Sequence, residues 1–68
     1  MNDDTFNMGL RRFLKQVGIT SQRALEDAAR EASDAGKLKG RRTVKARMVL
    51  TVEAFGLTHT VEEEIPLE

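Results

Sequence analysis

His59 is the only histidine in the 68-residue sequence, and the sequence contains no cysteine. Nucleophilic catalysis needs a base, most often histidine, beside a hydroxyl or thiol nucleophile. The neighbouring hydroxyls of Thr58 and Thr60 would point to the opposite side of an extended strand from His59. We therefore interpret His59 as a structural strand residue and predict that the protein is not an enzyme. The weakest alternative is a small enzyme whose site, shared between subunits, contains His59.

Carboxylates are the other groups that can bind a cation. A structural zinc site usually takes four Cys and His ligands, which this sequence cannot supply. Glu62, Glu63 and Glu64 are consecutive, but alternation along a strand sends Glu63 to the opposite face from the other two. Residues 36–40, Gly-Lys-Leu-Lys-Gly, lack the residues and the strand-before-helix context of a phosphate-binding loop. The sequence predicts no catalytic, cofactor-binding or metal-binding residues, and no cofactor.

Charge is segregated along the chain, although eleven Lys and Arg balance eleven Asp and Glu. Residues 37–47 contain six basic and no acidic residues, whereas residues 48–68 contain five acidic and no basic ones. A basic cluster is the usual electrostatic footprint of a phosphate-binding surface. The alternative function is therefore a nucleic-acid-binding protein that uses the basic 37–42 loop. Its anion contacts would be Lys37, Lys39, Arg41 and Arg42.

A second feature bears on nucleic acid. Residues 13–21 are similar to the turn of a helix-turn-helix unit. The segment that follows carries two arginines and four acidic residues, so a phosphate backbone would repel a recognition helix there. An ordinary corner between two helices is favoured, and nucleic acid is the less favoured partner.

Apolar spacing predicts two helices before residue 36. The large apolar residues of about 4–17 recur with a period of 3.6 residues, and Asp3 or Asp4 is the expected N-cap. We expect Gly18 to end this helix in the left-handed conformation. Thr20 or Ser21 would then cap a second helix, about 21–35. The inner stripe of the second helix consists of Leu25, Ala28, Ala29 and Ala32, and Gly36 is its expected C-cap.

The apolar period changes from 3.6 to 2 after the basic loop. This change predicts strands at about 43–53 and 57–67, joined around residues 54–56 as an antiparallel hairpin. We expect Val52 to face Leu57, so that paired residue numbers sum to 109. This register sets Lys45 opposite Glu64 and Arg47 opposite Glu62, and opposite charges at such positions stabilise a hairpin. A bulge near Gly56 is the alternative.

The predicted fold class is α+β, a single domain of residues 1–68 with two helices packed on a C-terminal antiparallel β-hairpin (ααββ). A chain of this length buries only about 60% of the surface of its unfolded form, so it is marginally stable alone. Both hairpin edges are open. We therefore expect a non-enzymatic protein-interaction or regulatory module whose partner is an unknown protein or a second copy, as a homodimer through strand edges. Phe55, at the hairpin tip, is either a core residue or an exposed interface anchor.

No apolar run approaches the roughly 20 residues that span a bilayer, so we expect a soluble cytoplasmic protein with no membrane partner. Four segments resemble a family of short bacterial proteins of unknown function: residues 2–8 (NDDTFNM), 15–23 (KQVGITSQR), 36–40 (GKLKG) and 57–59 (LTH). The resemblance covers nearly the whole chain and implies a stand-alone domain of bacterial cytoplasmic origin. It includes no catalytic motif, so no functional residue can be transferred.

Overall fold

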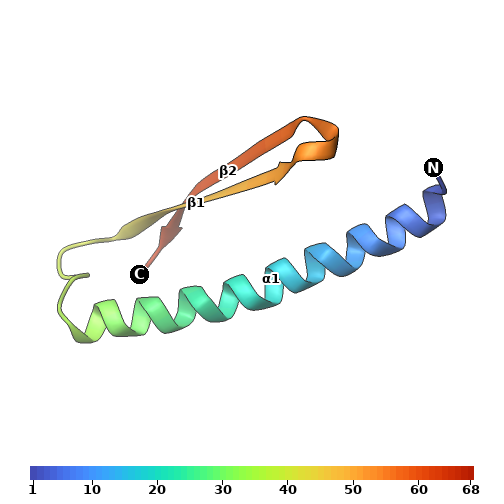
Figure 1. Ribbon diagram of the computed structural model, residues 1–68. Coiled ribbons are helices and arrows are strands. Elements are labelled where there is room, and N and C mark those ends of the chain that lie inside the picture. The colour runs from blue at the N-terminus through green and yellow to red at the C-terminus, as the bar shows by residue number, and fades with distance from the viewer. The chain divides into compact units, whose positions relative to one another are not determined.

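The computed structural model describes residues 1–68 and contains one helix followed by a two-stranded hairpin (Figure 1). The helix, α1, spans Asp3–Asp34; the strands, β1 and β2, span Thr43–Val52 and Leu57–Pro66. The chain divides into two compact units, Met1–Leu38 and Lys39–Glu68. The α+β class is as predicted, but the prediction of two helices is wrong.

α1 continues without a break through Gly18. Positive φ angles occur only at Gly36, Gly40 and Gly56, so Gly18 does not adopt the left-handed conformation expected of a C-cap. Thr20 does not cap a second helix, because its hydroxyl donates to the Gln16 carbonyl at 2.8 Å, as Ser and Thr do inside helices. The predicted helices at about 4–17 and 21–35 are one 32-residue helix. The turn of the helix-turn-helix resemblance is absent for the same reason.

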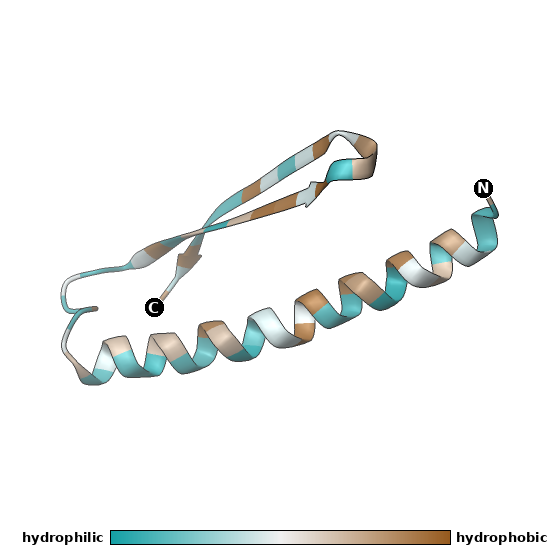
Figure 2. Cartoon of the chain, in the orientation of Figure 1, coloured by the Kyte–Doolittle hydropathy of each residue, from teal (hydrophilic) through white to brown (hydrophobic).

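The physical reason is that the two predicted helices are in phase. Residues 10, 14, 17, 21, 24 and 28 follow one another at spacings of four and three, which keeps them on one face of a single α-helix. Glycine inside a helix costs only about 1 kcal/mol relative to alanine. The continuous ladder of helix hydrogen bonds outweighs that cost. Figure 2 shows hydrophobic bands recurring along α1 between hydrophilic ones.

Both ends of α1 have defined caps. The side chain of Asn2 accepts a hydrogen bond from the Thr5 backbone N–H at 3.1 Å, so Asn2 is the N-cap rather than Asp3 or Asp4, which occupy the first turn. At the other end, the Gly36 N–H donates to the Ser33 carbonyl at 3.0 Å. The Lys37 N–H donates to the Ala32 carbonyl at 2.9 Å. These two bonds and the φ of 76° at Gly36 form a Schellman motif, which confirms the predicted cap at Gly36.

The hairpin has the predicted register. Val52 faces Leu57, and every pair along the ladder sums to 109, from Thr43 opposite Pro66 to the loop, with no bulge. The loop is a short 3-10 helix, Glu53–Phe55, closed by Gly56 at φ 62°. Each strand ends one residue before its predicted boundary. The predicted packing of helix on hairpin stays a prediction.

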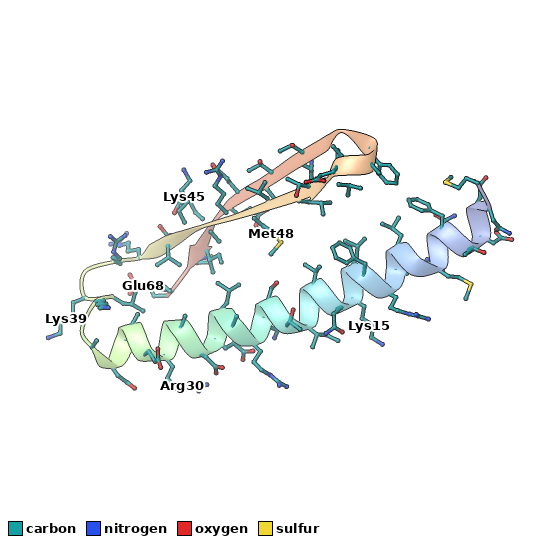
Figure 3. The ribbon with its side chains drawn as sticks, viewed as in Figure 1. Lys15, Arg30, Lys39, Lys45, Met48 and Glu68 are labelled. Atoms are coloured by element: carbon teal, nitrogen blue, oxygen red, sulfur yellow. The ribbon has the colours of Figure 1, made fainter.

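The two faces of the hairpin differ in chemistry. One face, which we call the apolar face, carries the even-numbered residues of β1 and the odd-numbered residues of β2: Val44, Ala46, Met48, Leu50, Val52, Leu57, His59, Val61, Glu63 and Ile65. The other, polar face carries the lysine, the arginine and four threonines. Figure 3 shows Lys45 and Met48 on opposite sides of the ribbon, as this alternation requires.

Candidate interaction surfaces

No side chain in the structure is fully buried. On α1, Phe13 is 48% exposed and Leu14 is 52% exposed, although both lie on the apolar stripe. On the hairpin, Met48 is 45% exposed and Val61 is 50% exposed. A single helix and a two-stranded sheet cannot enclose their own apolar faces. Neither unit therefore encloses its own apolar face.

Along α1, the stripe changes character from its N-terminal to its C-terminal half. Phe6, Leu10, Phe13, Leu14 and Val17 supply large side chains in the first half. In the second half the same face is continued by Ser21 and by alanines, of which Ala32 is half-buried. Small residues contribute little area but let another backbone approach closely. The first half of α1 thus has the larger apolar side-chain area, and the second half lets the backbone of a neighbouring element come closer.

Two exposed ion pairs lie on the polar face of the hairpin. The Lys45 ammonium lies 3.4 Å and the Arg47 guanidinium 3.3 Å from the carboxylate of Glu62. Glu64, the directly opposite partner of Lys45, instead accepts a hydrogen bond from the Thr43 hydroxyl at 3.0 Å. All of these side chains are exposed, so each pair contributes little, of the order of 0–1 kcal/mol. Their main effect is to neutralise Glu62 within the hairpin.

The four predicted anion-binding residues lie between the helix cap and the start of β1. Lys37, Lys39 and Arg41 are exposed and have no carboxylate within ion-pair distance. Arg42 differs, because its guanidinium lies 3.6 Å from the Glu68 carboxylate. Figure 3 shows the Lys39 side chain extending from the segment that follows α1. Three of the four predicted cations are therefore available to an external anion.

Phe55 occupies the last position of the 3-10 loop and is 62% exposed. The hairpin does not bury it, so within this unit Phe55 is not a core residue. Its position at the tip of the hairpin is compatible with the predicted role of an interface anchor. Its role as an interface residue stays a prediction.

His59 and Glu63 are the only ionisable residues on the apolar face of the hairpin. His59 faces Leu50 and Glu63 faces Ala46 across the ladder, and neither side chain has an ion pair or a hydrogen bond within the chain. No group of three or more His, Asp or Glu side chains is arranged to hold a metal ion. Parity along the strand was the signal that placed both residues on this face. Nothing in the spacing alone indicates that the two residues act together.

A family model, described as a family of unknown function (DUF6494), matches residues 1–68. The chain therefore belongs to this family, in agreement with the resemblance over nearly the whole chain. Comparisons with curated proteins and with solved structures gave no match. None of the helices is both long and apolar enough to cross a membrane.

Proposed function

We propose that this DUF6494 protein is a non-enzymatic protein-interaction module that acts by associating with a second copy of itself. One observation carries the proposal: no side chain is buried, and fourteen large apolar residues are at least 37% exposed. Burying apolar surface is the main favourable contribution to both folding and association, at about 25 cal/mol per Å². A second copy would supply surface against which these side chains can be buried.

The hairpin supports this proposal through its backbone as well. Each strand of a two-stranded sheet has one unpaired edge, and such edges pair readily with another strand. A sheet of three or more strands is considerably more stable than an isolated hairpin. Edge pairing would therefore add backbone hydrogen bonds to the burial of apolar side chains.

Sedimentation equilibrium at several concentrations between about 1 and 500 μM tests this function. We expect the weight-average mass to rise from 7.6 kDa toward twice that value. A mass that stays at 7.6 kDa over the whole range, with a cooperative melt, contradicts self-association. Phe55→Ala is the variant to compare, since Phe55 is exposed and lies outside both strands.

A second candidate function is nucleic-acid binding by the segment of residues 37–42. It is favoured by one observation, the three cations Lys37, Lys39 and Arg41 that have no carboxylate partner. Binding of this kind weakens steeply with salt, because it releases counterions from the phosphates. We expect amide signals of this segment to shift with single- or double-stranded DNA or with RNA at low salt and to return at high salt. Spectra that are unchanged at low salt contradict this function.

A further inference from the structure

The edge of β2 has a defined set of hydrogen-bonding groups. The Leu67 N–H donates to the Arg42 carbonyl at 2.7 Å, so residues 42 and 67 form a hydrogen-bonded pair of the ladder. Hydrogen-bonded pairs recur every second residue in an antiparallel sheet. The odd-numbered residues of β2 therefore bond to β1, and the even-numbered ones direct their backbone groups outward. Thr58, Thr60, Glu62 and Glu64 form this free edge.

The sequence of β2 is self-complementary about Val61. Reading outward from Val61, Thr60 is matched by Glu62, His59 by Glu63, Thr58 by Glu64, and Leu57 by Ile65. Two antiparallel copies of β2 centred on Val61 would therefore set apolar opposite apolar, imidazole opposite carboxylate, and hydroxyl opposite carboxylate. The outward-directed even-numbered residues would pair with each other, as the edge geometry requires.

From this symmetry we infer that two copies of the chain pair through the β2 edges, with Val61 on the two-fold axis. The result is a four-stranded sheet of order β1-β2-β2-β1. This inference rests on the proposed self-association and specifies which surface carries it.

His59 and Glu63, which have no partner within the chain, favour pairing through the β2 edge. Each His59 would face Glu63 of the second copy, and the two-fold axis makes this contact twice. These are the two ionisable side chains of the apolar face that have no partner within the chain. An imidazole N–H can donate a hydrogen bond to a carboxylate that lies opposite it on a neighbouring strand. Association would thus satisfy both side chains at once.

The hydroxyl and carboxylate pairs have a precedent in the hairpin itself. The Thr43 hydroxyl already donates to the Glu64 carboxylate between β1 and β2 at 3.0 Å. Thr60 opposite Glu62 would repeat that chemistry across the axis. Arg47 and Lys45 of β1 lie 3.3 and 3.4 Å from the Glu62 carboxylate and offset its charge. This reduces the electrostatic repulsion between the Glu62 side chains of two approaching β2 strands.

Other registers of the same edge are less favourable. Centring the pair on Glu62 sets that carboxylate opposite its own copy, and centring it on Thr60 sets Glu63 opposite Leu57. Like charges directly opposite one another destabilise a sheet. Pro66, which lacks an N–H, lies opposite Gly56 in the register centred on Val61, beyond the last strand pair, and so removes no hydrogen bond from it.

The β1 edge is the competing surface. Pairing two β1 strands about Met48 would set Arg47 opposite Val49 and Lys45 opposite Thr51, with no opposite charges across the axis. Lysine and other charged residues at an edge are a common protection against pairing. Pairing β1 with β2 of another copy is heterologous and leaves open edges at both ends, so it would not close into a dimer.

Disulfide trapping with single-cysteine variants tests the register, because the natural chain has no cysteine. Val61→Cys would place the two thiols in a non-hydrogen-bonded pair on the axis, with Cα atoms about 4.5 Å apart, which a disulfide can bridge. Met48→Cys is the matched control, since Met48 faces Val61 on the same face and is the centre of the competing β1 pairing. With oxidised glutathione as the oxidant, we expect Val61→Cys to form covalent dimer at least about tenfold faster than Met48→Cys.

A charge exchange provides a second measurement that does not depend on thiols. His59→Glu should weaken the dimer about tenfold or more, because two carboxylate pairs would then face each other. Adding Glu63→Lys to His59→Glu should restore the affinity, since opposite charges again meet across the axis. Circular dichroism of each variant verifies that the helix and the hairpin still form.

The outcomes separate this inference from the proposed function. Faster trapping of Met48→Cys, or a dimer whose affinity is unchanged by His59→Glu, overturns the β2 pairing but leaves self-association in place. A dimer that neither cysteine traps places the interface elsewhere and also overturns it. A chain that stays monomeric in sedimentation overturns both the pairing and the proposed function.

Discussion

At the scale of single residues, Asn2 and Gly36 set the limits of α1. Four N–H groups at a helix start and four carbonyls at its end have no partner within the helix. At the start of α1, the Asn2 side chain accepts a hydrogen bond from one of these N–H groups, that of Thr5. At the end, the left-handed conformation of Gly36 lets the N–H groups of Gly36 and Lys37 donate to two of the unpaired carbonyls. Asn2 and Gly36 thus set the start and the end of α1, and no residue between them interrupts the helix.

Asn2→Ala should therefore destabilise the helix by about 1 kcal/mol, the usual cost of losing an N-cap. The measurement is the helical circular dichroism signal at 222 nm during thermal unfolding. Asn7→Ala is the matched control, because Asn7 lies exposed inside α1 and alanine is the better helix former there. An Asn2 variant that is as helical and as stable as the parent chain would contradict the capping role.

At the scale of elements, the continuity of α1 depends on Gly18 being an ordinary helical residue. A Cβ added at Gly18 would meet no atom within 4 Å, and its φ is not positive. The apolar stripe therefore runs along one face for the length of the helix instead of being divided between two elements. A helix of this length offers a long surface to a partner.

Gly18→Ala should raise the free energy of unfolding by up to about 1 kcal/mol, because alanine is the stronger helix former and nothing obstructs its methyl group. Gly36→Ala should lower it by roughly 1–2 kcal/mol, because Gly36 has a φ of 76° that a side chain disfavours. Urea unfolding followed by circular dichroism measures both changes. A Gly18→Ala variant that is less stable than the parent would indicate a helix break at this position.

At the scale of the whole molecule, 68 residues form two units and bury no side chain completely. The conformational entropy lost on folding is about 1–2 kcal/mol per residue for the backbone, and apolar burial is the main contribution that opposes it. A second copy that binds only the folded chain would stabilise the folded state by mass action. Stability would then rise with protein concentration over the range in which sedimentation detects the dimer. If copies associate, folding and assembly of this chain are linked.

Much of the hairpin was predictable from the sequence. Its register followed from the alternation of apolar residues and from the two cations of β1, because a slip by one residue would exchange the faces. Which carboxylate each cation contacts was not predictable. Both Lys45 and Arg47 lie near Glu62, and Glu64 accepts a hydrogen bond from the Thr43 hydroxyl. Long side chains reach diagonal as well as direct partners, so the ladder alone does not fix their contacts.

By itself the sequence determined the α+β class, the cap at Gly36 and the pairing of β1 with β2, since each depends on local geometry or on a strict period of two. Only the three-dimensional structure decided whether Gly18 ends a helix and whether the hairpin buries Phe55. Glycine is compatible with a cap and with a helix interior, and the choice depends on the hydrogen bonds of the turns on both sides. Burial likewise depends on which atoms surround a side chain in space, which spacing along the chain does not specify.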